Sequence, residues 1–394
     1  MQIGTHRFDR VEFAGSLGDL GTLIPLSVAL MVITGLSVTS VLLAAGLFYI
    51  FCGLYYELPI PVQPLKLVSA IAIAYPEKIT LPIMSAAATT FGLILLFLAI
   101  TGLIDRIAKF FTKAIMRGIQ VGLGLILISK GLGLILSSEL FINGGEAVFI
   151  GNIPINPVIG IAGTLITLLL LSSKRFPAAL VVVSAGLVIG ILFGALSGVS
   201  LTFGPTPVRL YVPGTDDFIN AFILLVIPQI PLTLGNAVMG TTDTCYTLFG
   251  KGDHTKKATY RAFAASMGLT NIAVGTIGAM PMCHGAGGLA AHYRFGARTG
   301  GSDIMIGLIF LIIGLGFGRI GISFLSAIPN AVLGILLLFA GLELTLMIRD
   351  VKDKNDLFVV FLIAGVGFAT TNMGIAFFSG IVVSFLIRWR KLTL

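Results

Sequence analysis

Two stretches rich in proline and glycine decide how this chain folds. The first reads LPIPVQPLKLVSAIAIA over 58–74, and the second reads MPMCHGAGGLAAH over 280–292. Both are apolar, but their prolines or glycines leave only about a dozen residues of helix, fewer than the roughly 20 that cross a bilayer. They predict two helices that begin in the middle of a membrane.

The composition around these stretches is typical of a polytopic all-α membrane protein. Hydrophobic residues make up 56% of the 394 residues and charged residues 11%, against about 25% charged residues in soluble domains, and the mean hydropathy is +1.04. This excludes a cytoplasmic enzyme, a DNA-binding protein and a secreted disulfide scaffold. We expect about fourteen spans, near 13–34, 38–56, 62–74, 83–103, 115–136, 154–171, 176–196, 219–242, 260–279, 285–293, 302–317, 322–347, 356–371 and 373–388, and no soluble regulatory domain.

The positions of the basic residues predict the orientation in the membrane. If the N-terminus is cytoplasmic and the sides alternate, all but five of the 25 Lys and Arg residues fall on the cytoplasmic side, as the positive-inside rule requires. The exceptions are Lys78, Arg209 and Arg319 outside, and Lys66 and Lys130 within spans. We therefore expect an integral protein of the cell membrane with both termini cytoplasmic. The net charge of +8 then follows from this topology in the lipid bilayer and indicates no nucleic-acid partner.

The two short spans also predict an internal repeat. They are the third and the tenth of the expected spans, as they would be if spans one to seven and eight to fourteen were copies of one unit. Because seven is odd, the second copy must be inverted. We predict a first repeat over 1–197 and a second over 198–394. Interrupted spans at matching places in two halves mark the binding site of secondary transporters, and the unpaired N–H groups at two helix starts suit a small oxyanion.

Polar residues in the third and eighth spans are candidates for substrate binding. Gln63 and Pro64 precede the expected helix start, and Lys66 is an intramembrane cation, which is expensive to bury and usually functional. The alternative is that Lys66 pairs with a carboxylate and only locks two helices together. In the eighth span, three side chains share one helix face and indicate a cavity lining or, alternatively, an interhelical hydrogen-bond seam: Gln229, Thr233 and Asn236.

Further candidates lie at the second helix start and in two other spans. His284 could bind the anion or relay a proton, or be purely structural, and Gly285 and Gly287 follow it at the helix start. Asp19 is the first candidate both for pairing with Lys66 and for binding a proton. Glu343 is the second proton candidate.

Several chemistries have no signature in the sequence. Nothing fits the phosphate-binding pattern G-x-x-x-x-G-K-[ST], and Cys283 and His284 have no further metal ligands at a suitable spacing. We therefore expect no enzyme activity, no metal and no cofactor. Gly118 and Gly122 indicate a close helix contact, either within the chain or in a homodimer.

Three segments resemble the signature segments of the molybdate transporter family, a branch related to the sulfate permeases. They are EFAGSLGDLGT over 12–22, PVQPLK over 61–66 and PQIPLTLGNA over 228–237. The resemblance implies a seven-plus-seven inverted-repeat fold like that of uracil permease, with core and gate domains and with spans one, three, eight and ten around the substrate. We therefore expect a secondary-active transporter of a tetrahedral oxyanion, molybdate first and sulfate second. Because a membrane potential that is negative inside opposes the entry of a dianion, we also expect a coupled cation, with a proton as the first choice. The alternatives are an anion channel and a nucleobase or organic-anion carrier on the same fold.

Overall fold

The computed structural model describes residues 2–107, 112–142, 148–170, 178–197 and 202–389. These residues are mostly helical, and their strands form three two-stranded antiparallel pairs. Among the described residues, six helices are long and apolar enough to cross a membrane: Val38–Tyr56, Leu81–Thr101, Lys113–Ile135, Thr215–Phe249, Gly301–Ser326 and Asn330–Asp350. Four shorter apolar helices accompany them: Leu23–Thr34, Ile155–Leu170, Ala178–Leu192 and Met373–Ile387.

The elements follow one another in an order close to that of the expected spans. The first half holds β1 (Gln2–Ile3), β2 (His6–Arg7), α1 (Arg10–Ser16), α2 (Leu20–Thr34), α3 (Val38–Tyr56), β3 (Gln63–Pro64), α4 (Lys66–Ala74), α5 (Leu81–Thr101), α6 (Ile104–Ile107), α7 (Lys113–Ile135), β4 (Phe149–Ile150), β5 (Ile153–Pro154), α8 (Ile155–Leu170) and α9 (Ala178–Leu192). The second half holds α10 (Thr215–Ala221), α11 (Ile227–Leu232), α12 (Thr241–Phe249), α13 (Tyr260–Thr276), β6 (Met282–Cys283), α14 (Ala286–Phe295), α15 (Gly301–Ser326), α16 (Asn330–Thr345), α17 (Lys354–Thr370) and α18 (Met373–Arg388).

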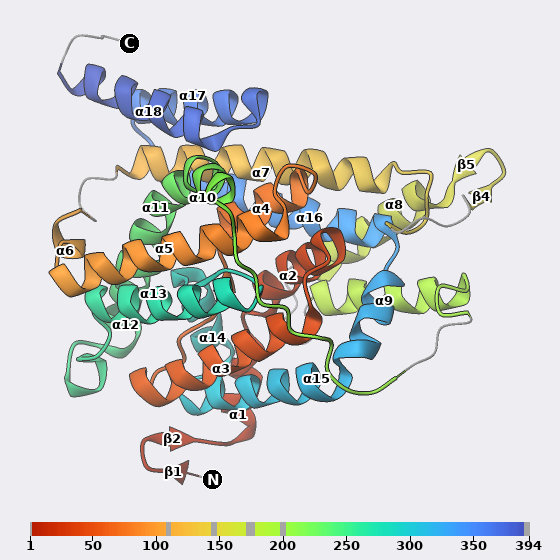
Figure 1. Ribbon diagram of the computed structural model, residues 1–394, viewed down its shortest axis with the longest axis horizontal. Helices are drawn as coiled ribbons and strands as arrows, with labels where there is room; N and C mark the ends of the chain where they lie inside the picture. Colours follow the sequence, from red (N-terminus) through yellow and green to blue (C-terminus); the bar gives the residue numbers. More distant parts are fainter. Residues whose placement is uncertain (1, 108–111, 143–147, 171–177, 198–201, 390–394) are drawn as a thin grey trace.

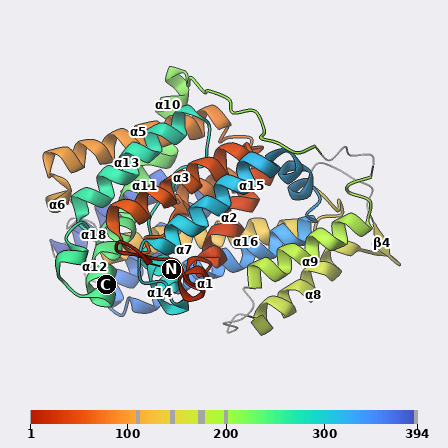
Figure 2. The same ribbon diagram turned by 90° about the horizontal axis from the view of Figure 1, so that it is seen from below.

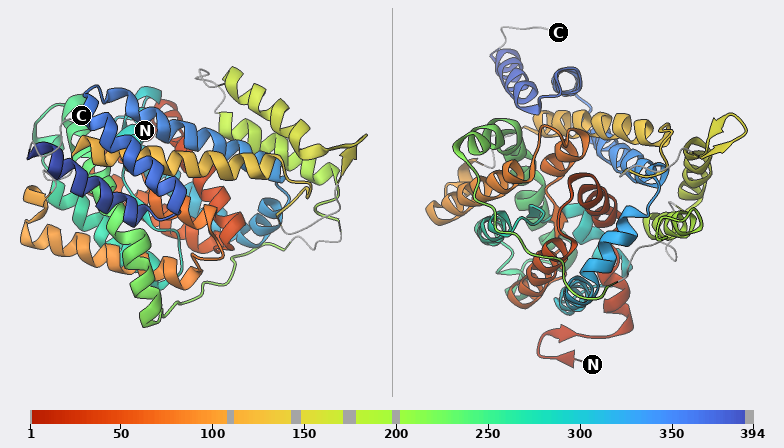
Figure 3. Two further views of the ribbon diagram at one scale, coloured as in Figure 1. Left: turned by 90° about the horizontal axis from the view of Figure 1, so that it is seen from above. Right: turned by 45° about the vertical axis from the view of Figure 1, so that its right-hand side comes forward.

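Helices from the two halves of the chain pack against each other in pairs. α3 lies along α15, α5 along α13, and α7 along α16 (Figures 1 and 2). α17 and α18 lie at one edge of the bundle and α8 and α9 at another (Figure 3). The short helices α4 and α14 each contact elements of both halves: α4 contacts α2 and α11, and α14 contacts α1 and α12.

Glycines seven residues apart allow close contact at two of these crossings. A Cβ on Gly124 would lie 2.5 Å from the carbonyl oxygen of Gly341, and a Cβ on Gly131 would lie 2.6 Å from that of Gly334. The same spacing brings α3 to α15, with Gly46 against Gly307 and Gly53 against Gly300. In lipid, such backbone contact replaces the hydrophobic driving force between helices. Gly118 and Gly122 likewise pack against α17 of the same chain.

Two expected spans differ in form from the sequence prediction. The span expected over 13–34 is broken, because α1 ends at Ser16 and α2 begins at Leu20. Its glycines serve close packing: a Cβ on Gly15 would overlap Ala297, and one on Gly18 would lie 2.8 Å from the carbonyl oxygen of Ala291. The span expected over 219–242 is a longer helical run, Thr215–Phe249, which contains two π-helical segments.

The basic loops gather at one end of the bundle. α6, the turn between α12 and α13, the pair β1–β2 and the end of α18 lie toward the left in Figures 1 and 2, whereas β4 and β5 lie at the opposite end. The cytoplasmic orientation of this end stays a prediction. Five of the basic residues behind that prediction lie outside the described residues: Lys109, Lys174, Arg175, Arg390 and Lys391.

Candidate functional site

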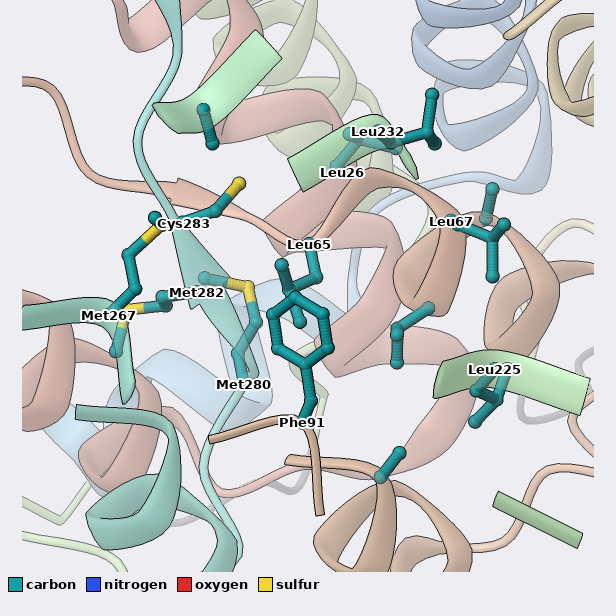
Figure 4. Packing of buried hydrophobic residues seen from close by; sticks show 14 of the residues in the cluster. Leu26, Leu65, Leu67, Phe91, Leu225, Leu232, Met267, Met280, Met282 and Cys283 are labelled. Atoms are coloured by element: carbon teal, nitrogen blue, oxygen red, sulfur yellow. The ribbon is translucent and has the colours of Figure 1, made fainter. Parts of the chain in front are cut away.

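The two proline- and glycine-rich stretches meet at the centre of the molecule. β3 pairs with β6 in antiparallel register, Gln63 opposite Cys283 and Pro64 opposite Met282, and the Leu65 N–H donates to the carbonyl oxygen of Pro281 at 2.8 Å. α4 begins directly after β3, and α14 follows β6. Figure 4 shows Leu65, Met282 and Cys283 within the buried cluster around this crossing. The two interrupted helix starts are thus held together by a backbone ladder.

A small cavity lies beside this crossing. Its lining comes from α4, α7, β6 and the helical run after Pro228: Lys66, Gln120, Gln229, Leu232, Thr233, Asn236, Ala237 and Cys283. Its volume is about 10 Å³, which is room for about one water molecule. Lys66 gives this lining a positive charge, and no lining residue is acidic. The polar face predicted in the eighth span and the predicted cation of the third span therefore line one cavity.

The hydrogen bonds around the cavity fix which groups can still donate. The Oε1 of Gln229 accepts the Leu67 N–H at 3.0 Å, and the Oε1 of Gln120 accepts from Arg117 Nη1 at 2.8 Å. Because both amide oxygens are engaged by protein donors, each amide keeps N–H donors for other partners. Thr233 Oγ1 accepts from Gln229 Nε2 at 3.0 Å, which leaves its own hydroxyl hydrogen available. A cation surrounded by N–H and O–H donors is a lining that suits an anion.

The local sequence explains the shape of this wall. Pro228 and Pro231 lack the N–H that a regular helix needs, and the residues that follow, Thr233–Gly240, form a π-helical segment. Such segments occur frequently at functional sites. Gly235 also permits a close approach of α7, because a Cβ there would overlap the sulfur of Met116. The proline and glycine positions thus bring Thr233 and Asn236 to the cavity.

Other predicted site residues gather at the strand crossing and not in the cavity lining. Gln63 Nε2 donates to both carboxylate oxygens of Asp19, at 2.9 and 2.8 Å. A Cβ on Gly285 would collide with the Gln63 side chain, and one on Gly288 would lie 2.6 Å from Asp19 Oδ2. A Cβ on Gly287 would meet nothing within 4 Å. The absence of side chains on Gly285 and Gly288 therefore leaves room for the pair of the Gln63 amide and the Asp19 carboxylate.

His284 and Glu343 lie away from the cavity lining. The Nδ1 of His284 lies 2.9 Å from the carbonyl oxygen of Pro61, and its Nε2 lies 3.2 Å from Ser266 Oγ. These contacts tie the segment before α14 to both the segment before β3 and α13, as a structural histidine would. Glu343 is exposed on α16. The structure therefore does not bring these two candidates together with Lys66.

Four lining residues were missed in the sequence analysis: the apolar Leu232 and Ala237, and Gln120 and Cys283. Gln120 is an uncharged polar residue in the apolar span 115–136, and that polarity was a usable signal. Cys283 was considered only as a metal ligand, and its position opposite Gln63 in the ladder brings it to the cavity. Within the described chain, no cluster of three or more His, Cys, Asp or Glu side chains could hold a metal ion.

The arrangement of helices is similar to solved transporter structures. The transmembrane domain of the bicarbonate transporter BicA from a cyanobacterium matches with a TM-score of 0.70 and 16% identity, over 94% of this chain and 98% of that one. The murine Slc26a9 anion transporter in its inward-facing state matches with a TM-score of 0.72 and 15% identity, over 100% of this chain and 70% of that one. The fold is thus that of a helical membrane transporter, as predicted, while the count of fourteen spans stays a prediction.

Sequence comparisons narrow this class to a family. The model of the family described as "Molybdate transporter of MFS superfamily" matches residues 11–127 and 221–344. Molybdate transporters 2 and 1 of Arabidopsis thaliana are 32% and 30% identical, over 97% and 96% of this chain and 88% of each relative. Molybdate transporter 1 of Chlamydomonas reinhardtii is 28% identical, over 94% of this chain and 90% of the relative. The chain belongs to the molybdate transporter family, which confirms both the resemblance and a transport protein in place of an enzyme.

Proposed function

We propose that this protein is a secondary-active transporter of a tetrahedral oxyanion, with molybdate as the first substrate and sulfate as the second. The observation that carries the proposal is the cavity lining, in which Lys66 is surrounded by neutral donors and no acidic residue. A dianion needs such a combination of charge and hydrogen bonds when it leaves water. The names of the Arabidopsis and Chlamydomonas relatives support molybdate as the first choice.

Binding requires the cavity to widen. At about 10 Å³ the cavity has room for about one water molecule and is too small for an ion with four oxygen atoms. Gln120 lies on α7, whereas Lys66 and Asn236 lie on elements around the strand crossing. We propose that α7 belongs to the gate domain and the strand crossing to the core domain. Movement of one against the other then opens the site, as in alternating access.

The helix pairs support two inverted repeats, 1–197 and 198–394. α5 and α13 correspond to the fourth and ninth expected spans, and α15 and α3 to the eleventh and second. If each span is exchanged for the span seven positions away in the chain, the first pair becomes the second. The same shift exchanges β3 with β6 and α7 with α16, which are also partners. The proposed boundary lies beside residues 198–201, outside the described chain.

We further propose that the protein works in the cell membrane with both termini cytoplasmic and with a proton as the coupling ion. The gathering of the basic loops at one end of the bundle supports this orientation. A membrane potential that is negative inside opposes the entry of a dianion by about 2.3 kcal/mol per charge per 100 mV. Accumulation therefore needs a co-transported cation, for which the sequence offers Asp19 first and Glu343 second.

Uptake into proteoliposomes tests the substrate and the transport class. We expect labelled molybdate uptake that saturates, that unlabelled sulfate inhibits, and that uracil leaves unchanged. Anion currents without saturation would indicate a channel, and inhibition by uracil without inhibition by sulfate would indicate an organic-anion carrier. Either result would overturn the proposal.

Cys283 offers an independent test of where the anion binds. It lines the cavity, and Cys52→Ala together with Cys245→Ala removes the other two cysteines of the chain. We expect molybdate to slow the reaction of the Cys283 thiol with a small methanethiosulfonate reagent. A Cys283→Ala protein in the same background is the control for non-specific labelling. Labelling that molybdate does not slow would place the site elsewhere.

A further inference from the structure

A second pair of polar side chains is completely buried away from the cavity. His292 lies in the last turn of α14 and Asp303 in the first turn of α15, and both have an exposed fraction of 0%. The His292 Nδ1 lies 3.7 Å from Asp303 Oδ1 and 3.3 Å from the carbonyl oxygen of Pro59. His292 Nε2 and both carboxylate oxygens lack a hydrogen-bond partner among the described residues. Buried carboxylates without donors are rare in folded proteins.

The groups around this pair do not neutralise the carboxylate. Tyr49 on α3 stacks on the His292 ring at 6.3 Å, but its hydroxyl donates to the carbonyl oxygen of Val62. Cys52 on α3 and Glu12 on α1 are the other titratable groups that face Asp303. The Glu12 carboxylate accepts the N–H groups of residues 298 and 299. Among the residues that the structure describes, no lysine or arginine forms an ion pair with Asp303.

Two further polar groups lie near the Asp303 carboxylate: the backbone of Ile60 and the hydroxyl of Ser302. Neither has the distance and angle of a hydrogen bond to it. The Ser302 hydroxyl donates to the carbonyl oxygen of Thr299 at 2.9 Å. Asp19 differs, because its carboxylate accepts two hydrogen bonds from Gln63. Among the described residues, no such donor reaches the Asp303 carboxylate.

Charge balance then assigns one proton to the buried pair. A neutral histidine beside an ionised aspartate would leave an uncompensated negative charge in the core, which is strongly unfavourable. One bound proton makes the pair neutral, either as Asp–COOH beside neutral histidine or as an imidazolium–carboxylate ion pair. When water reaches the carboxylate, the pair can transfer this proton to the water. No covalent bond other than the one to the proton is broken.

We infer that the buried His292–Asp303 pair is a proton-binding site that couples proton movement to anion transport. The inference rests on the proposed function and assigns the coupling proton to this pair in place of Asp19 and Glu343. Its link to the cavity is α14 itself, which begins three residues after the cavity residue Cys283. His292 lies seven residues beyond Gly285, about 10 Å along a helix axis at 1.5 Å per residue. A shift of α14 on anion binding therefore changes the separation of His292 from Asp303, which belongs to α15.

Gradient-driven uptake tests this assignment. Wild-type protein in liposomes clamped at zero membrane potential is given labelled molybdate and an inward acid gradient of one pH unit. One coupled proton supports about tenfold accumulation per pH unit. We expect Asp303→Asn to reduce the accumulation ratio to that without a gradient while molybdate exchange at equal pH continues. Ser302→Ala is the matched neighbour and is expected to keep the gradient response.

The possible failures are distinguishable. A wild type without molybdate exchange would overturn the proposed function, whereas a wild type with exchange but no gradient response would overturn this inference alone. A folded Asp303→Asn protein that keeps the gradient response, or that loses exchange as well, would also overturn it. If that variant does not fold, the neutral double variant His292→Gln/Asp303→Asn is measured instead. If neither folds, Asp19→Asn decides: retention of the gradient response supports the inference, and loss of it transfers coupling to Asp19.

Discussion

The side-chain oxygen of Gln229 accepts the backbone N–H of Leu67 at 3.0 Å, so a residue of the second half of the chain caps a helix of the first half. The first N–H groups of α4 have no partner within the helix, and Leu65 at its N-cap offers no side-chain hydrogen bond. The side chain of Gln229 on α11 supplies the missing hydrogen-bond acceptor. It therefore has a structural role in addition to lining the cavity.

Two substitutions of Gln229 should separate these roles. Gln229→Ala leaves the buried Leu67 N–H unsatisfied, and we expect a loss of stability of about 1–3 kcal/mol. Gln229→Glu keeps an acceptor for Leu67 but puts a negative charge beside the anion, so it should weaken molybdate binding more than it lowers stability. Thermal unfolding in detergent and calorimetric titration measure the two effects. Equal stability of Gln229→Ala and wild type would contradict the capping role.

The charge of Lys66 can be tested against the other intramembrane lysine. Lys66→Gln should weaken molybdate binding by about 1.5–3 kcal/mol, the typical value of a hydrogen bond to a charged group, which is roughly a ten- to hundred-fold change in affinity. Lys130→Gln removes the same charge from α7 at a position that does not line the cavity. It should bind molybdate normally. Similar losses in both variants would mean that Lys66 acts only through the overall charge.

The start of α14 provides another matched pair. A Cβ on Gly288 would lie 2.5 Å from Gln63 Nε2 and 2.6 Å from Asp19 Oδ2, whereas one on Gly287 would meet nothing within 4 Å. We expect Gly288→Ala to disrupt the Gln63–Asp19 contact and to abolish uptake, and Gly287→Ala to be tolerated. Uptake and thermal unfolding of both variants measure this difference. Normal uptake by Gly288→Ala would show that the amide–carboxylate pair is dispensable.

The sequence predicted the parts of the site that depend on local pattern. The prolines and glycines of 58–74 and 280–292 predicted two short helices, and the structure places their starts together. The offsets of Gln229, Thr233 and Asn236 predicted a shared face, and these residues line one cavity with Lys66. Such features follow from helix periodicity and from the backbone limits of proline and glycine.

The contacts that depend on how distant helices cross could not be predicted in this way. Asp19 was expected to pair with Lys66, but two of its hydrogen bonds come from Gln63, because the close packing at Gly285 and Gly288 brings the amide to it. The position of His284 between Pro61 and Ser266 likewise depends on the strand ladder. The break between α1 and α2 and the π-helical segments of Thr215–Phe249 also change the directions of the side chains. A regular helical periodicity does not predict these changes.

The glycine contacts between α7 and α16 should be sensitive to a single methyl group. A Cβ on Gly131 would lie 2.6 Å from the carbonyl oxygen of Gly334, whereas one on Gly133, two residues further on, would meet nothing within 4 Å. We expect Gly131→Ala to destabilise the protein by about 1–3 kcal/mol through overpacking. Gly133→Ala should have little effect, since the side chain meets no neighbour. Thermal unfolding of the two variants under identical conditions makes the comparison, and equal midpoints would contradict the tight crossing.

The ion pair at the end of α3 gives the protein a pH-dependent contact outside the spans. Lys257 Nζ lies 2.7 Å from Glu57 Oε1, and this hydrogen bond holds the pKa of Glu57 below its ordinary value. A lowered folded-state pKa contributes stability that is present above the unfolded-state pKa and is lost as the pH falls through the folded-state pKa. Because both side chains are about one-third exposed, solvent screening limits the contribution to under about 1 kcal/mol.

Glu57→Gln should therefore lower the unfolding midpoint slightly at neutral pH, and the difference from wild type should shrink as the pH falls below about 4. The substitution keeps the side-chain length at this position of positive φ, so backbone strain is unchanged and the charge alone is tested. Lys257→Met is the reciprocal control, and the double variant should be no less stable than either single one. Thermal scans of the four proteins at neutral and acid pH measure the effect. A difference between Glu57→Gln and wild type that persists undiminished at acid pH would show that the ion pair is not its source.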